Sequence, residues 1–374
     1  MKKIDEKPIL TAFCFTDIHV QQSMLDYPVT LRKSFLIAAE NAVKEFGKAD
    51  ITVMGGDNVS DYPYWNKSCA LPKKNFIDLK QKLQAVAEKT AKGGKVFYVA
   101  GNNDFMLGDI GTAENEPYNT TDFYDCIEKA FGAFPENEKL EVKSKYKPKE
   151  RYWDAFHTVV NGVDFIGVNI NPDTAYNTHD GYYTEEALTW VKNKLNEIDP
   201  DGVKPVFIVG HLSALYYFDG TELKETLPKN KELFFDVFKN HKNAFYLYGH
   251  EHGESAAYKN YTSAAVLHVD KNNMPLDNNV GQNDNVGKEY SFSLVHMGGL
   301  RPFNAENFAN DGIVGFGGLP EKQYYPSTGT PLLAQYLVIE VYADKAVFFM
   351  RNAGSKTGYD AGDRLLPYTV FFRK

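Results

Sequence analysis

The sequence predicts an α/β protein with two packed β-sheets, and two observations support this prediction. The N-terminal two thirds alternates short apolar runs with amphipathic segments, which is typical of parallel strands joined by helices. The last third contains strands that follow one another without helices between them, which indicates antiparallel pairing. A chain of 374 residues can bury a large core, and no linker or repeat divides it. We therefore expect a single domain over residues 1–374.

The alternating part begins and ends with a strand. Strands are predicted at residues 9–15, 50–56, 95–101, 163–170, 204–210 and 243–249. Helices are predicted between them at residues 31–47, 74–94, 121–131, 184–198 and 231–241. Gly47 ends the first of these helices, and Gly93 with Gly94 ends the second. Thr184 is the predicted cap of the fourth helix, which carries acidic residues in its first turn.

Antiparallel pairing is predicted at three places. Residues 151–170 contain a hairpin that turns at Asn161 and Gly162, because an Asn-Gly pair favours a two-residue turn. Residues 332–354 contain a long closing hairpin, and residues 288–299 contain another strand. Such strands are expected in a second sheet that is partly antiparallel.

The two ends of the domain are expected to differ in role. Residues 1–255 contain the chemically informative motifs, and residues 256–374 are expected to complete the second sheet. Two Gly/Asn-rich loops, at residues 272–288 and 304–330, interrupt this second part. Loops of such length are usually functional or disordered.

Composition and charge exclude several classes of protein. The net charge of -8 argues against a nucleic-acid scaffold, whose phosphate contacts need a basic face. The cysteines are odd in number and far apart, so neither a disulfide framework nor a zinc cluster is expected: Cys14, Cys69 and Cys126. No apolar run is long enough to span a membrane, and Asp5 and Glu6 interrupt the only signal-like start. We expect a cytoplasmic protein, or a secreted one if a signal peptide has been removed.

Polar side chains cluster at the carboxyl ends of five predicted strands, where open α/β sheets bind ligands. They are Asp17, His19, Asp57, Asn102, His211, His250 and His252. Each motif alone also fits a solvated loop or a hydrogen-bonded histidine, but their conjunction favours a metal site. Residues i and i+2 of an extended segment point to the same side, so Asp17 and His19 can reach one metal together. His250 and His252 can likewise serve two neighbouring metals.

The residue types indicate which metals fit. Mixed imidazole and carboxylate ligands suit Zn, Mn, Fe, Co or Ni better than Ca or Mg. Glycine precedes four of the five groups, which allows the backbone to turn sharply and approach closely. The sequence therefore predicts a transition-metal site at the carboxyl edge of the sheet.

The order D-x-H, G-D, G-N-x-D, H and G-H-x-H resembles that of the calcineurin-like metallophosphoesterases, over the span Asp17 to His252. The closing hairpin is also similar to part of that family's second sheet. The resemblance implies a four-layer sandwich of two mixed β-sheets flanked by helices. It also implies a phosphatase or phosphodiesterase that hydrolyses phosphomonoesters or phosphodiesters, with a small phosphorylated molecule as substrate.

The resemblance also implies a role for each motif residue. The ligands of a first metal ion would be Asp17, His19 and His252. The ligands of a second would be Asn102, His211 and His250. Asp57 would bridge two divalent or trivalent ions, with Mn, Fe or Zn the leading candidates, and a hydroxide between the ions would attack phosphorus. Two divalent ions outweigh the charges of Asp17, Asp57 and the hydroxide, so the site would attract an anionic phosphate although the chain is acidic.

The sequence departs from the family pattern at Asn103. Most members have a histidine there, oriented by the following acid, which is Asp104 here. An amide cannot supply a proton to the leaving group, so Asn103 implies an easier leaving group, a water-delivered proton or a substitute acid. His179, in a polar loop, is a candidate for that acid, and a solvated loop residue is the other interpretation. The alternative to a hydrolase is a catalytically impaired, metal-bearing binding protein of the same fold.

Overall fold

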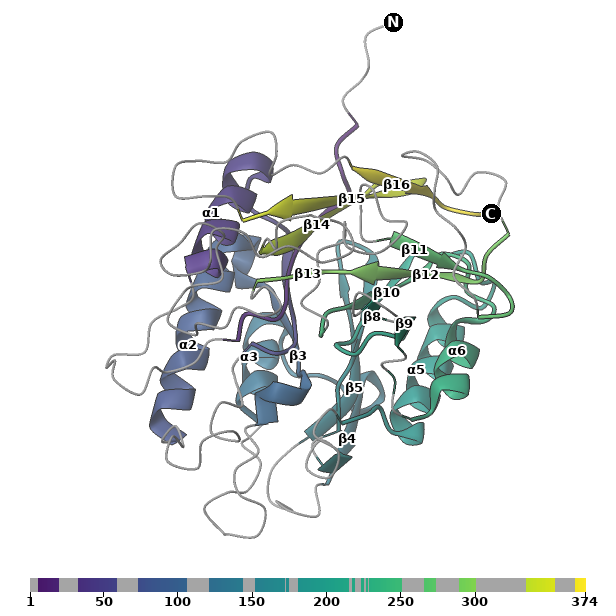
Figure 1. Cartoon of the computed structure of the whole chain (residues 1–374), viewed down its shortest axis with the longest axis horizontal. Helices are drawn as coiled ribbons and strands as arrows, with labels where there is room; N and C mark the ends of the chain where they lie inside the picture. Colours follow the sequence, from purple (N-terminus) through teal and green to yellow (C-terminus); the bar gives the residue numbers. More distant parts are fainter. Residues whose placement is uncertain are drawn as a thin grey trace, which may run out of the picture.

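The computed structural model describes most of the chain with its side chains. The described residues are 6–19, 33–58, 73–105, 121–143, 152–171, 173–174, 181–214, 217–218, 223–224, 227, 229–250, 266–273, 289–300, 334–353 and 367–374. Within these ranges the strands form two seven-stranded sheets and a small two-stranded ribbon. Figure 1 shows the sheets side by side in the middle of the molecule, with helices on both outer sides.

The first sheet joins both ends of the chain. Its parallel strands are β1 (Leu10–Phe15), β2 (Ile51–Gly55) and β3 (Val96–Val99). Its antiparallel strands are β13 (Gly298–Gly299), β14 (Gln335–Val341), β15 (Lys345–Asn352) and β16 (Tyr368–Phe371). The strand order is β16-β15-β14-β1-β2-β3, and β13 pairs with β14.

The second sheet is also mixed, and its order is β11-β12-β10-β7-β6-β5-β4. The parallel strands are β6 (Val163–Val168), β7 (Val206–Val209), β10 (Ala244–Tyr248) and β12 (Phe292–His296). The antiparallel strands are β4 (Lys139–Val142), β5 (Tyr152–Val160) and β11 (Val266–Val269). The separate ribbon pairs β8 (Tyr217–Phe218) with β9 (Leu223–Lys224).

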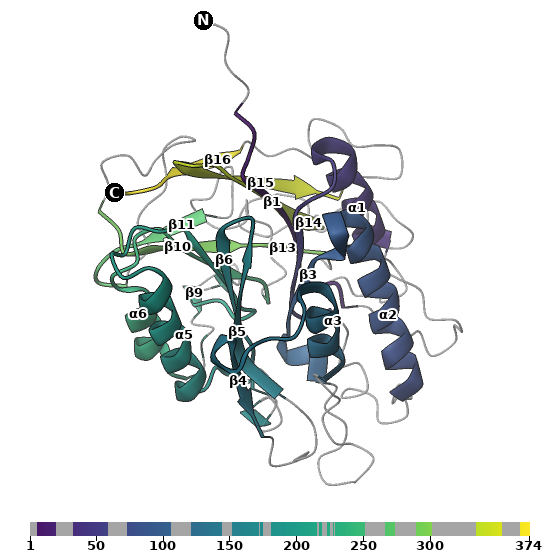
Figure 2. The same cartoon turned by 180° about the vertical axis from the view of Figure 1, so that it is seen from behind.

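Two groups of helices form the outer layers, as the front and back views show (Figures 1 and 2). One group is α1 (Lys33–Phe46), α2 (Lys73–Thr90) and α3 (Thr121–Phe131). The other is α5 (Glu185–Ile198) and α6 (Lys231–Phe238). Short 3-10 turns lie at η2 (Lys92–Gly94), η3 (Asn102–Phe105) and η4 (Glu136–Glu138). The predicted fold of two mixed sheets flanked by helices is therefore confirmed.

Aromatic side chains fill the space between the two sheets. Phe97 of β3 packs against Phe156 of β5, with ring centroids 4.7 Å apart. Phe245 of β10 packs against Phe348 of β15 at 5.3 Å. These contacts bury large apolar surfaces on the inner faces of both sheets. They fix the position of one sheet, and of the carboxyl ends of its parallel strands, relative to the other.

The structure corrects one expectation about the C-terminal part. Of the strands described after residue 255, β11 and β12 join the second sheet, whereas the closing hairpin β14–β15 pairs with β1 in the first. The physical reason is that all six residues of β1 are buried, so β1 cannot serve as an exposed edge strand. Pairing with β14 satisfies its outer backbone groups.

Local predictions from the sequence hold at two places. The β5–β6 hairpin turns at Asn161 and Gly162, whose φ angles of 51° and 80° are those of a type I′ turn. Thr184 caps α5, and its side chain accepts a hydrogen bond from the backbone N–H of Ala187. Among the described helices, none is both long enough and apolar enough to cross a membrane.

Candidate metal centre

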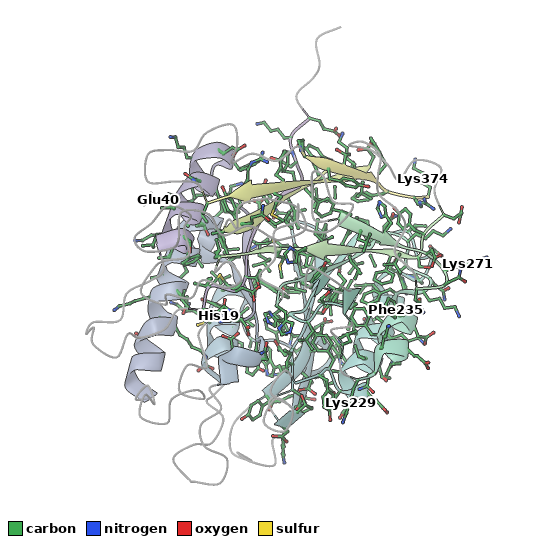
Figure 3. The ribbon with its side chains drawn as sticks, viewed as in Figure 1. His19, Glu40, Lys229, Phe235, Lys271 and Lys374 are labelled. Carbon is green, nitrogen blue, oxygen red and sulfur yellow. The ribbon has the colours of Figure 1, made fainter. Side chains whose placement is uncertain are left out.

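Six of the seven predicted ligands lie together where the two sheets meet. The loops after β1, β2 and β3 of the first sheet and after β7 and β10 of the second bring in Asp17, His19, Asp57, Asn102, His211 and His250. All of these side chains are buried except that of His250, which is half-buried. Figure 3 shows His19 inside the molecule, between the two outer layers of helices.

Asp57 is the centre of this arrangement. Its Oδ2 atom lies 3.3 Å from His211 Nε2 and 3.5 Å from His19 Nε2. Possible ligand atoms of Asp57, His211 and His250 all lie within 4.8 Å of one another, and those of Asp17, His19 and Asp57 do the same. One carboxylate therefore belongs to two groups of potential metal ligands.

The separations between neighbouring ligand atoms fit a transition metal. Two N or O ligands about 2.1 Å from one ion, at angles between octahedral and tetrahedral, lie about 3.0–3.4 Å apart. The His250 Nδ1 and Asn102 Oδ1 atoms are 3.2 Å apart, which falls in this range. His19 Nε2 and Asp17 Oδ1, at 3.7 Å, need only a small adjustment. The side chains present thus fit the ions that such a donor set takes.

The ring of His211 is oriented as a metal-ligating imidazole should be. Its Nδ1 lies 3.0 Å from the backbone carbonyl oxygen of Gly55. A carbonyl oxygen can only accept, so Nδ1 carries a proton and donates it. Nε2 then faces Asp57, and metal-binding histidines are commonly held in this way by their other ring nitrogen.

Charge in the cluster favours a cation between the carboxylates and the imidazoles. Burial by itself would raise the pKa of Asp57, but His211, His19 and His250 together hold it well below its usual range. Burial opposes a charge on His211, yet the neighbouring Asp57 and Asp17 raise its pKa to about 9. Burial raises the pKa of Asp17 to about 7, although the charge of His211 opposes this. Positive charge is thus stabilised here, as a cation site requires.

The backbone is strained at these residues. Among the described residues, seven that are not glycine have a positive φ angle, and four of them are Asp17, His19, Asp57 and His250. Such conformations cost free energy and persist where the surrounding structure imposes them, often at functional sites. The gathering of four such residues at one place therefore distinguishes this group from the other described loops.

Two glycines permit the close approach of the loops. Gly56 has a φ of 95°, and a Cβ atom there would lie 2.5 Å from His211 Nδ1. A Cβ atom on Gly101 would lie 2.2 Å from Asp57 Oδ1 and 2.4 Å from the Asp57 backbone nitrogen. Any other residue at these positions would displace a predicted ligand.

Asp104 joins two of the ligand loops. Its carboxylate accepts hydrogen bonds from the backbone N–H groups of Asn58 and Gly101, both at 2.9 Å. The side-chain amide of Asn58 donates a further hydrogen bond of 3.3 Å. Asp104 therefore fixes the residues that follow Asp57 and precede Asn102, whereas its orienting role toward residue 103 stays a prediction.

Three further supporting residues were missed from the sequence. Thr16 donates a hydrogen bond of 2.9 Å to Asp17 Oδ2. Asn169, just after β6, accepts a hydrogen bond of 2.8 Å from the backbone N–H of Ala100, just before the Asn102 loop. The Tyr183 hydroxyl accepts one of 2.8 Å from the backbone N–H of His211. Thr16 is adjacent to a motif and was detectable, whereas Asn169 and Tyr183 depend on contacts between distant segments.

Some predicted residues lie outside the described part of the chain. They are His252, His179 and the side chain of Asn103. The loop predictions for residues 274–288 and 304–330 fall there too. Their proposed roles remain predictions.

The family follows from comparison with known proteins. The calcineurin-like phosphoesterase family model matches residues 10–254, which include every predicted ligand. The chain belongs to the calcineurin-like phosphoesterase family. No match is found among curated protein sequences.

Of the solved structures that are similar to this calcineurin-like phosphoesterase, one supports the fold. A dimetal phosphatase from Danio rerio is 12% identical, with a TM-score of 0.55 over 98% of this chain and 100% of that chain. An NAD nucleotidase from Haemophilus influenzae is 9% identical, with a TM-score of 0.40 over 97% of this chain and 50% of that chain. A predicted phosphoesterase from Streptococcus pneumoniae is 11% identical, with a TM-score of 0.31 over 97% and 98% of the two chains.

Proposed function

We propose that the protein is a phosphoric ester hydrolase that works with two transition-metal ions and acts on small phosphomonoesters or phosphodiesters. Asp17, His19 and His252 would hold one ion, and Asn102, His211 and His250 the other. Asp57 would bridge the pair. The observation that supports this most strongly is the position of Asp57 Oδ2, within 3.5 Å of imidazole nitrogens from both groups.

When bound, paired transition-metal ions supply a nucleophile derived from water at neutral pH and stabilise negative charge on the phosphoryl oxygens. The chain's own part is to hold the ligands in place. Asp17 is fixed by the backbone N–H of His250, 3.0 Å from its Oδ2, and by the Thr16 hydroxyl. Asn102 contributes a neutral oxygen, so it leaves the site more positive than a third carboxylate would.

The proposed substrates are esters with acidic leaving groups. Asn103 occupies the position where most family members have a histidine, and an amide has no proton to give at neutral pH. A missing general acid typically lowers the rate by about 10²–10⁴, and most for poor leaving groups. Esters whose leaving group departs as a stable anion would depend least on such an acid.

The test is a screen of nitrophenyl phosphate and bis-nitrophenyl phosphate with Mn, Zn, Fe or Co added to the metal-free protein. We expect hydrolysis of at least one ester with at least one metal, lost in Asp57→Asn and retained in Asp125→Asn, whose exposed carboxylate lies on α3. Two bound ions without hydrolysis of either ester would favour the alternative, a metal-bearing binding protein that has lost catalysis at Asn103. A protein that neither binds metal ions nor hydrolyses either ester would contradict the proposal.

A further inference from the structure

Two buried tyrosines contact the loop that carries His211. Tyr183 lies just before α5 and Tyr246 lies in β10, and their side chains are 1% and 0% exposed. The Tyr183 hydroxyl oxygen accepts hydrogen bonds from the backbone N–H groups of His211, at 2.8 Å, and Leu212, at 2.9 Å. The two hydroxyl oxygens lie 2.8 Å apart.

The direction of each hydrogen bond follows from the partners. Tyr246 donates to the carbonyl oxygen of Leu212 at 2.7 Å, which uses its single proton. Tyr183 must therefore donate its own proton to the Tyr246 oxygen. Burial raises the pKa of Tyr183 to about 12, so its hydroxyl keeps that proton at neutral pH. Every hydrogen of the pair is thus assigned, and both peptide groups of the loop are satisfied.

The space for these hydroxyls depends on the residue before His211. A Cβ atom on Gly210 would lie 2.4 Å from the Tyr246 hydroxyl and 2.6 Å from the Tyr183 hydroxyl. His211 is held at two points, by the segment just before α5 and by the first sheet. Tyr183 holds its backbone, and the Gly55 carbonyl of the first sheet holds its ring at Nδ1. These two contacts direct Nε2 toward Asp57.

We propose that Tyr183 and Tyr246 are positioning residues that hold His211 as a metal ligand, an inference that rests on the proposed function. Their contributions should differ. Removal of the Tyr183 hydroxyl would leave two buried N–H groups without an acceptor, which carries a full desolvation cost. Removal of the Tyr246 hydroxyl would leave Tyr183 able to accept the hydrogen bonds from both N–H groups. The loop would then lose only the contact at the Leu212 carbonyl.

The test measures metal affinity directly, with Mn²⁺ titrated into metal-free protein against a chromophoric chelator. In Tyr183→Phe we expect one of the two ions to bind about 10–100-fold more weakly, as is usual when the partner that orients a ligand is removed. Tyr246→Phe should weaken the same ion less. Excess Mn²⁺ should restore hydrolysis to both variants, because the ligand set itself is intact.

Tyr124→Phe is the matched control, because it removes another buried hydroxyl, which donates to the Trp153 carbonyl oxygen at 3.1 Å. It should bind both ions as the wild type does. The inference would be overturned if Tyr183→Phe kept wild-type affinity for both ions, or if Tyr124→Phe lost as much. If Tyr183→Phe does not fold, Tyr246→Phe decides: wild-type affinity would overturn the inference. A wild type that binds none of Mn²⁺, Zn²⁺, Fe²⁺ and Co²⁺ would instead overturn the proposed function itself.

Discussion

At the scale of single residues, position 103 is where the proposed chemistry departs from that of most family members. Asn103 follows a predicted ligand directly and precedes Asp104, whose carboxylate already accepts N–H groups from Asn58 and Gly101. A histidine introduced at position 103 would therefore share Asp104 with contacts that hold two ligand loops together. This histidine could donate a proton, but Asp104 would orient its ring less firmly than a carboxylate that has no other partners.

We predict that the wild type depends steeply on leaving-group acidity and cleaves nitrophenyl esters much faster than alkyl esters. Asn103→His should raise the alkyl ester rate most, by about 10²-fold, the low end of what a general acid supplies. Steady-state kinetics on a series of esters would measure this. Asn103→Gln, which restores no proton donor, is the control and should leave the series unchanged.

A different outcome would locate the acid elsewhere. Similar rates for alkyl and nitrophenyl esters in the wild type would mean that another group donates the proton. His179 is the first candidate for that group, because its loop precedes α5 and the strand that leads to His211. The prediction that Asn103 leaves the wild type without a general acid would then be wrong.

We predict that Asp154 makes the stability of the fold depend on pH. It is buried on β5, where it accepts hydrogen bonds from Thr184 and Asn171, and burial raises its pKa to about 7. Between about pH 4 and 7 the folded chain holds a proton that the unfolded chain has released, so the free energy of unfolding falls as pH rises through this window. The loss amounts to about 1.4 kcal/mol for each pH unit crossed.

Asp154→Asn cannot ionise, so its free energy of unfolding should fall less steeply with rising pH than that of the wild type, while Asp17 and His211 still contribute. Denaturant unfolding between pH 5 and 8, with EDTA present to remove metal effects, would measure both slopes. Asp125→Asn, whose carboxylate is exposed, should keep the wild-type slope. Parallel curves for Asp154→Asn and the wild type would contradict the assignment.

At the scale of elements, hydrogen bonds extend the pairing of strands into the ligand loops. Beyond β1 and β2, the backbone N–H of His19 donates to the carbonyl oxygen of Asp57 at 2.9 Å. Beyond β7 and β10, the N–H of Gly249 donates to the carbonyl oxygen of His211 at 3.0 Å. Each of these four loops is thus held by a neighbouring loop of the same sheet, so the arrangement of the strands determines where the ligands lie.

We predict that Gly101→Ala loses metal binding as well as stability. A Cβ atom there would lie 2.4 Å from the backbone nitrogen of Asp57, which cannot move without moving the end of β2. Overpacking of this kind costs about 1–3 kcal/mol. Gly132→Ala is the control, because its Cβ atom would meet nothing within 4 Å although its φ is 89°. It should lower stability while metal content, measured by mass spectrometry, stays at the wild-type level.

The sequence predicted the described α-helices and the longer strands, and it singled out six side chains that the structure brings together, because both leave local signals. Asn161–Gly162 marks its own turn, Thr184 marks its own helix, and Gly–polar motifs mark the carboxyl ends of strands. The pairing of β14 with β1 was not predictable in this way, because it joins segments from opposite ends of the chain. Tyr183 was missed for the same reason: its contact with His211 exists only after the sheet has formed.

At the scale of the whole molecule, the centre lies on the junction between two sheets. Asp17, Asp57 and Asn102 follow strands of the first sheet, and His211 and His250 follow strands of the second. Ions bound to both sets would link the sheets only in the folded chain. Anything that binds the folded state alone stabilises it, by about 2.7 kcal/mol at a concentration of 100 Kd.

We therefore predict that removal of metal by EDTA lowers the melting temperature of the whole domain, by about 3 °C for each ion held at 100 Kd. Differential scanning calorimetry with and without added Mn²⁺ would measure the shift. Asp57→Asn, which removes the proposed bridge, should show a much smaller shift. Equal shifts in both proteins would place the stabilising ions elsewhere.

The central claim is that Asp57 bridges two metal ions, and anomalous diffraction from a crystal grown with Mn²⁺ tests it most directly. We predict two anomalous peaks, both within about 2.3 Å of Asp57 carboxylate oxygens and about 3.5–4 Å from each other. One peak should contact His19 and the other His211. A single peak, or peaks that do not share Asp57, would contradict the account.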